Sequence, residues 1–136
     1  MLNTSDEGII SFQIPYLEKV WTTKEIFDYF NINDNGDIAN SGQILDGILI
    51  MKKNKNIINL NNIWYNVIYE NPLLFTDYYN NNQESYFKDN RHEQSVFSII
   101  RKMNNPILLE DETWFPNFGS EESLKYPFWA TRFRKS

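Results

Sequence analysis

Residues 90–102, which read NRHEQSVFSIIRK, constrain the fold of this chain more than any other stretch. Their apolar positions recur with the i, i+3, i+4 spacing of a helix that has one buried face: Val96, Phe97, Ile99 and Ile100. Asp89 or Asn90 could accept the free N–H groups of the first turn. The stretch therefore predicts a helix packed against a core, with polar residues gathered at its start.

The polar residues at this helix start, 91–94, allow two interpretations. Glu93 suits the positive end of the helix dipole, and residues of these types are typical of an ordinary capped and solvated first turn. A polar first turn beside a buried face is also well placed to present side chains to a ligand. Spacing alone favours the first interpretation.

Strands and helices are expected in alternation before and after this helix. Strands are predicted over residues 8–14, ending at Pro15, over 44–51, and over 106–109. Helices are predicted over residues 24–31, capped by Thr22 or Thr23, and over 56–69, stopped by Asn71 and Pro72. The side chains expected to face inward from these helices are Ile26, Phe27, Phe30, Ile57, Leu60, Trp64, Val67 and Ile68.

Two further segments carry no regular pattern. Residues 78–89 are polar and rich in Asn and Tyr, which predicts a mobile surface loop. Residues 113–129 are rich in Trp and Phe, and we expect them to wrap back onto the core as irregular structure.

Bulk composition excludes several classes of protein. The 136 residues make one domain with a modest core, and the hydrophobic share of 41% predicts that it folds. A net charge of −5 argues against binding nucleic acid, with a local basic exception at 132–135. The chain has no cysteine, no run long enough to span a membrane and no signal pattern, so a cytoplasmic protein is expected.

One asparagine-rich loop imitates a calcium site. Asn31, Asn33, Asn35 and Gly36 fall at the first, third, fifth and sixth places of an EF-hand loop. The twelfth place requires a bidentate Glu but holds Gly42, and the other places lack acidic ligands. We interpret this loop as a turn.

The polar stretch also carries a family resemblance. Residues 91–98 resemble the R-H-D-Q-S-hydrophobic motif of nucleotide-sugar-transferase-like proteins of the GT-A type. Residues 12–22, 40–50, 112–115 and 126–132 resemble the same group in the same order. The resemblance implies an α/β fold, a partial GT-A-like mixed sheet flanked by helices. It also implies that residues 1–136 form a single domain, equivalent to the carboxyl-terminal, acceptor-side half of such an enzyme.

The activity implied by the resemblance is transfer of a sugar from a nucleotide-sugar to an unidentified acceptor glycan or protein. Complete GT-A enzymes hold a divalent metal such as manganese, which bridges the diphosphate. The family's nucleotide-binding half precedes the first strand seen here, and this sequence has no Asp-x-Asp motif. We therefore expect no cofactor or metal within this chain, and expect it to be incomplete alone, with a second chain as the candidate that supplies the missing half. The alternative is a non-catalytic glycan- or protein-binding module or remnant.

The resemblance assigns Glu93 and Gln94 as the catalytic pair, by analogy with an Asp-Gln pair near the reacting sugar. Here Glu replaces Asp and reaches one methylene further. Arg91 and His92 are implied to bind substrate. Arg91 could hold a phosphate bidentately or pair with Asp89, and His92, the sole histidine, could act as a base or serve as a cap or surface residue.

A small-residue strand start lines the sugar pocket in glycogenin-like transferases. Its equivalent here is either Asn40, Ser41 and Gly42 or Leu45, Asp46 and Gly47. We favour Gly47, because it lies on the predicted strand and would let a ligand approach the backbone. The Asp46 carboxylate could bind sugar hydroxyls or could be a solvated charge at the strand edge.

Two remaining patterns have a functional and a structural interpretation. Residues 110–112, Glu-Asp-Glu, imitate a metal-binding strand end but follow the motif helix, where the resembled family has no metal ligands. The late aromatic residues could stack a sugar ring, although aromatic residues in a small domain usually form core. We favour the structural interpretation of both: Trp114, Phe115, Phe118, Tyr126, Phe128 and Trp129 as core.

Overall fold

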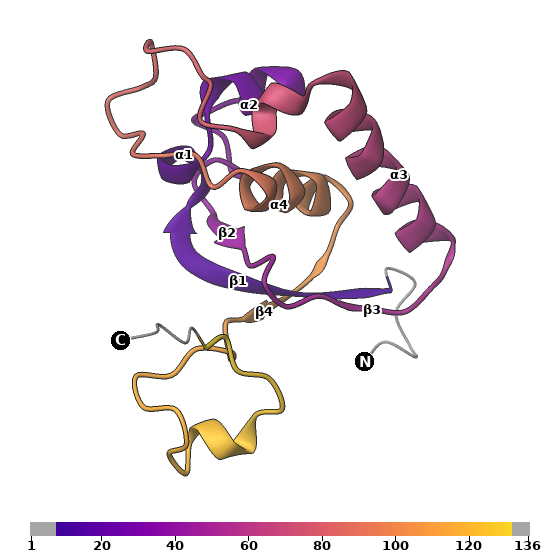
Figure 1. Ribbon diagram of the computed structural model, residues 1–136, viewed down its shortest axis with the longest axis vertical. Helices are drawn as coiled ribbons and strands as arrows, with labels where there is room; N and C mark the ends of the chain where they lie inside the picture. The colour runs from indigo at the N-terminus through magenta and orange to yellow at the C-terminus, as the bar shows by residue number, and fades with distance from the viewer. Residues whose placement is uncertain (1–7, 132–136) are drawn as a thin grey trace.

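The computed structural model describes residues 8–131 as a mixed sheet flanked by helices (Figure 1). The predicted α/β class is therefore confirmed. The basic stretch 132–135 lies outside the described residues. Of the helices within residues 8–131, none combines the length and the apolar character that crossing a bilayer requires.

The sheet is built around β1 (Ile9–Leu17), which pairs with every other strand of the described region. β2 (Gly42–Ile44) and β3 (Ile50–Met51) pair with it antiparallel, and β4 (Ile107–Glu110) pairs with it parallel. Ile10 lies opposite both Ile50 of β3 and Ile107 of β4, so β1 has neighbours at both edges.

Two strand predictions are corrected. The first strand does not end at Pro15 but continues to Leu17, because the pairing with β2 is irregular between Gln13 and Leu17 and a residue without an N–H is tolerated there. The single strand predicted over 44–51 is wrong. Its two ends pair with β1 as β2 and β3, whereas residues 46–49 leave the sheet.

The helices begin and end close to the predicted positions. The structure has α1 (Glu18–Trp21), α2 (Lys24–Tyr29), α3 (Lys55–Glu70) and α4 (Glu93–Met103), with 3₁₀ turns η1 (Pro72–Phe75) and η2 (Ser123–Lys125). Thr23 caps α2 as predicted, and Asn54 caps α3 by accepting from Ile57 N at 2.8 Å. α3 stops before Asn71 and Pro72, and α1 is too short to show a periodic pattern.

The core lies where α4 packs between α2, α3 and η1, on one side of β1 (Figure 1). The predicted inner face of α4 is confirmed, since its four apolar residues are at most 1% exposed. Trp64 of α3 stacks on Phe97 of α4 with ring centroids 4.4 Å apart. Ile68 was predicted to face inward but is 43% exposed, because α3 contributes only a narrow apolar stripe. The core consists of Ile26, Phe27, Ala39, Leu60, Val67, Leu74, Val96, Phe97, Ile99 and Ile100.

The predicted side-chain cap of α4 is wrong. His92 occupies the N-cap position with φ of 51°, and its side chain makes no capping hydrogen bond. The Asn90 amide instead donates to the carbonyl oxygens of Leu74 and Thr76, so this residue ties η1 to the start of α4.

The predicted surface loop over 78–89 is confirmed as irregular structure, and it is attached to α2. The Glu25 carboxylate accepts hydrogen bonds from Asn80 N at 2.7 Å and from Gln83 Nε2 at 2.8 Å. Lys24 N donates to Gln83 Oε1 at 2.8 Å. These contacts hold the loop across the start of α2, so that it can position Asp89 and Asn90 ahead of α4.

The aromatic segment after β4 does not wrap back onto the core as predicted. It lies on the other side of β1 from the helices (Figure 1) and forms an aromatic cluster of its own, in which Phe115 contacts Phe118 and Tyr126. Phe115 is buried, but Trp114 is 59% exposed, and Phe128 and Trp129 are also exposed. The assignment of these three residues to the core is therefore wrong.

Candidate functional site

A depression of about 290 Å³ lies at the start of α4, and we call it the polar depression. It contains five of the six residues that sequence reasoning assigned to the site, with Gly47 absent from its lining. Its lining residues are Asp46, Asp89, Asn90, Arg91, His92, Glu93 and Gln94. Asp46 reaches it from the loop after β2, so segments far apart in the sequence meet here.

Asp46 and Glu93 bring two carboxylates to this depression. Asp46 is half-buried and Glu93 is exposed. Burial raises the pKa of Asp46 above its usual range, the negative charge of Glu93 raises it further, and the buried Arg101 acts in the opposite direction. Asp46 therefore takes up a proton more readily than an ordinary aspartate.

Arg91 lies against an aromatic ring rather than in an ion pair. Its guanidinium carbon is 4.4 Å from the centroid of the Trp21 ring. Arg91 N donates to Ser95 Oγ at 3.1 Å and to Trp21 O at 3.2 Å. The proposed partner Asp89 instead accepts from Asn90 N at 2.9 Å. Stacking orients the planar guanidinium and leaves its edge available to a ligand.

His92 joins the depression to the neighbouring loop. Its Nε2 lies 2.6 Å from Asp77 Oδ1. Its backbone is in the left-handed region, which is uncommon for a residue with a Cβ and which the surrounding contacts must hold in place. The imidazole is thus engaged with Asp77, and it fixes the entry into α4.

Gln94 is held by the scaffold below the depression. Its Nε2 donates to Gln43 Oε1 at 2.8 Å, and Gln43 Nε2 donates to Ser95 Oγ and Thr22 Oγ1, each at 3.2 Å. Gln43 is fully buried on β2. The first turn of α4 is therefore attached to β2 through side-chain amides, which fixes the orientation of the Gln94 amide.

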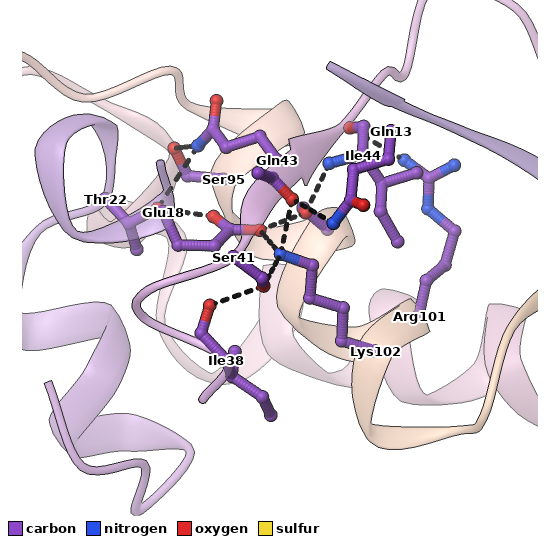
Figure 2. Close-up of polar contacts among 12 residues, drawn as sticks. Gln13, Glu18, Thr22, Ile38, Ser41, Gln43, Ile44, Ser95, Arg101 and Lys102 are labelled. Carbon is purple, nitrogen blue, oxygen red and sulfur yellow. Dashed lines mark hydrogen bonds and ion pairs between the residues drawn. The ribbon is translucent and has the colours of Figure 1, made fainter. Parts of the chain in front are cut away.

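A buried ion pair between Lys102 and Glu18 lies in the same polar network as Gln43 and Ser95, as Figure 2 shows. Lys102 Nζ lies 2.9 Å from Glu18 Oε1, and Thr22 Oγ1 donates to Glu18 Oε2 at 2.9 Å. Ser98 Oγ also donates to Glu18, and Lys102 donates to Gly42 O at 2.6 Å. Burial lowers the pKa of Lys102, and the charge of Glu18 opposes that change.

Arg101 is fully buried between α4 and β2. Its Nη2 donates to Leu45 O at 3.0 Å and to Ile44 O at 3.2 Å, and burial lowers its pKa to about 10. Arg101 thus holds the backbone that leads from β2 to Asp46. Sequence reasoning missed this role, as it missed those of Glu18, Gln43 and Lys102.

A signal for the buried network was present in the sequence of α4. Ser95, Ser98 and Lys102 are three and four positions apart and therefore lie on one stripe of the helix, beside its apolar face. Small hydroxyl residues on such a stripe indicate a polar contact with a neighbouring element. The partner residues in α1 and β2 carry no comparable pattern.

The two candidate glycines have different environments. A Cβ on Gly42 would lie 2.1 Å from Ile14 O, so close packing of β1 against β2 requires glycine there. A Cβ on Gly47 would meet nothing within 4 Å, and Gly47 is not on a strand. The strand-based reason for favouring Gly47 is therefore wrong, although its neighbour Asp46 does line the depression.

A second concavity of about 460 Å³ adjoins the first, and we call it the aromatic cavity. Arg91 and Gln94 line both concavities. The other lining residues of the aromatic cavity are Ile14, Pro15, Tyr16, Leu45, Asp111, Trp114 and Ala130. Trp114 therefore faces a cavity instead of the core.

The possible metal ligands of the described region do not assemble. Within residues 8–131, no three or more His, Asp or Glu side chains are placed to hold a metal ion together. The acidic stretch after β4 is organised differently, since Asp111 Oδ1 accepts from Thr113 N at 2.9 Å and from Thr113 Oγ1 at 2.6 Å. That geometry is a side-chain-stabilised turn.

Comparisons of the chain with protein-family models, with curated proteins and with solved structures find no match.

Proposed function

We propose that the polar depression binds a saccharide, as the acceptor-side wall of a nucleotide-sugar-transferase-like protein. The observation that carries this proposal is the meeting of Asp46 with the four consecutive residues 91–94 in one depression. The donor nucleotide-sugar and its divalent metal would be held by a second chain or a further segment.

The chemistry of the lining suits a polyhydroxylated ligand. Sugar hydroxyls both donate and accept hydrogen bonds, and the depression offers carboxylates, an amide and a guanidinium that match both functions. Glu93 is exposed and free to accept a proton from an acceptor hydroxyl, which is the task of a general base in glycosyl transfer. The half-buried Asp46 carboxylate provides a second acceptor for a neighbouring hydroxyl.

The scaffold gives these groups fixed positions. Arg91 is stacked on Trp21, His92 is paired with Asp77, and Gln94 is hydrogen-bonded to Gln43. Groups that are ordered before binding lose less conformational entropy when a ligand arrives. Fixed polar groups around a concave surface are therefore a reason to assign binding to this depression.

The alternative function is a non-catalytic glycan- or protein-binding module. The observation that favours it is the use of the motif side chains to hold the fold: Gln94 donates to Gln43, and Ser95 Oγ donates to Trp21 O at 2.6 Å. A motif of this kind can be required for folding without any turnover.

The test is calorimetric titration of the purified chain with a panel of mono- and disaccharides, followed by UDP- and GDP-sugars with manganese. We expect saccharide binding that is lost in Glu93→Gln and Asp46→Asn. The exposed Glu110 of β4 provides a matched control, and Glu110→Gln should bind like the parent. Absence of saccharide binding overturns the proposal. Saccharide binding that Glu93→Gln leaves unchanged supports the binding module instead, because a module does not need a general base.

A further inference from the structure

The aromatic cavity is bounded by two exposed rings that come from different parts of the chain. Tyr16, 50% exposed, lies near the end of β1, and Trp114, 59% exposed, lies in the segment that follows β4. The volume of about 460 Å³ is within the range of about 300–1,000 Å³ that is usual for ligand sites. Two large rings left exposed beside one cavity are not explained by packing of the core.

The chemistry of the lining selects among ligand classes. Tyr and Trp offer flat apolar faces, which suit the C–H face of a sugar ring as well as other apolar surfaces. Arg91 and Asp111 carry opposite charges, so the cavity selects neither an anion nor a cation. A neutral ring with one apolar face and several hydroxyls matches both the aromatic walls and the polar groups.

The polar groups of this cavity are also ordered before any ligand binds. Arg91 is stacked on Trp21, which in turn meets Tyr16 edge to face with ring centroids 6.0 Å apart. Asp111 is oriented by its two hydrogen bonds from Thr113. Tyr16 and Arg91, two lining residues that both contact Trp21, therefore need little rearrangement to accept a flat ring.

We infer that the aromatic cavity is a second saccharide subsite, which stacks a neutral pyranose ring between Tyr16 and Trp114. This inference rests on the proposed function of the polar depression. Arg91 and Gln94 line both concavities, so two linked sugars can occupy them at the same time and share these side chains. The preferred ligand is then at least a disaccharide.

The experiment compares monosaccharides with their dimers. The full chain is titrated with glucose, N-acetylglucosamine, mannose and galactose, and with cellobiose, N,N′-diacetylchitobiose, mannobiose and galactobiose. We expect one dimer to bind about tenfold tighter than its monosaccharide, a gain of the size that stacking provides. Trp114→Ala should remove that gain and leave monosaccharide binding unchanged, whereas the exposed aromatic control Tyr69→Ala, on α3, should retain it.

A second variant and an NMR signal distinguish loss of the second subsite from misfolding of the Trp114→Ala chain. Tyr16→Ala should reproduce the loss shown by Trp114→Ala. The indole N–H resonance of Trp114, identified by its absence in Trp114→Phe, should shift with the dimer and not with the monosaccharide. Equal binding of monosaccharides and dimers, or a dimer gain that survives both substitutions, overturns the second subsite while the polar depression stands.

The remaining outcomes separate this inference from the proposed function. Asp46→Asn should weaken monosaccharides and dimers alike, because it acts in the polar depression. If Trp114→Ala weakens a saccharide that Asp46→Asn binds normally, the aromatic cavity is a saccharide site but the proposed function of the polar depression is overturned. If no saccharide in the panel binds, both are overturned.

Discussion

Lys102 Nζ lies 2.9 Å from the carboxylate of Glu18, and the two side chains are only 6% and 0% exposed. The pair joins the last turn of α4 to α1. Hydroxyl groups of Thr22 and Ser98 donate to the same carboxylate, which satisfies the acceptor capacity that burial would otherwise leave unused. The packing of the last turn of α4 against α1 therefore depends on this buried ion pair.

Removing the cation should therefore cost considerable stability. Lys102→Met leaves the Glu18 carboxylate buried without its counter-charge, and we expect a loss of about 3–5 kcal/mol in the free energy of unfolding. The exposed pair of Lys125 and Glu122 gives the control, because Lys125→Met should produce no measurable change. Urea unfolding of the parent and both variants measures the difference. Equal stability of all three chains would show that the pair contributes nothing.

A double substitution separates the ion pair from general packing effects. Glu18→Gln combined with Lys102→Met removes both charges, so the double variant should be more stable than the sum of the two single losses predicts. Strict additivity in this cycle would mean that the two side chains do not interact energetically.

Arg101 should be required for the geometry of the loop that carries Asp46. Arg101→Met leaves the carbonyl oxygens of Ile44 and Leu45 without their donor, and we expect the free energy of unfolding to fall by about 2–4 kcal/mol. Arg91→Met removes an exposed stacked arginine and should cost about 1 kcal/mol or less. Denaturant unfolding distinguishes them. A smaller loss for Arg101→Met than for Arg91→Met would contradict the structural role of Arg101.

The long helices could be predicted because their signals are local. α3 and α4 each carry an apolar stripe with helical spacing, and Asn71 and Pro72 mark the end of α3. The interrupted strand could not be predicted in the same way. Residues 44–51 read as one apolar run, and only pairing with β1, more than thirty residues earlier, divides it into two strands.

The candidate site was partly accessible from the sequence for the same reason. Residues 91–94 are consecutive, so one helix start brings them together, whereas Asp46 was a candidate only because of the family resemblance. Arg101 and Glu18 could not be identified as buried, because a charged residue is expected at the surface unless its partner is known. Those partners lie in segments that only the tertiary structure brings close. The exposure of Trp114 likewise depends on where the segment after β4 lies.

The two glycines near β2 offer a matched comparison. Gly42→Ala would place a Cβ 2.1 Å from the backbone oxygen of Ile14, so β1 and β2 must separate. We expect the free energy of unfolding to fall by about 3 kcal/mol or more. Gly47→Ala enters open space and should change stability by less than about 0.5 kcal/mol. Thermal unfolding of both variants measures the contrast. A folded, fully stable Gly42→Ala chain would contradict the close approach of these strands.

Asp46→Asn should stabilise the chain near neutral pH, although it removes a residue of the proposed site. Burial and the charge of Glu93 raise the folded-state pKa of Asp46 above its ordinary value of 3.8. A carboxyl group with a raised pKa contributes stability that is fully present below the unfolded-state pKa and is lost as the pH rises through the folded-state pKa. At neutral pH the ionised Asp46 is therefore a cost, which Asn avoids because it carries no charge.

Melting temperatures measured from about pH 3 to pH 7 should show the variant above the parent at neutral pH, with the difference shrinking as the pH falls through the folded-state pKa. The exposed Asp37→Asn serves as the control and should not show this pH-dependent gain. A variant that melts below the parent at neutral pH would mean that attraction to Arg101 outweighs burial and the repulsion from Glu93. Such a result would make Asp46 part of the scaffold instead of a carboxyl group held at a stability cost for ligand binding.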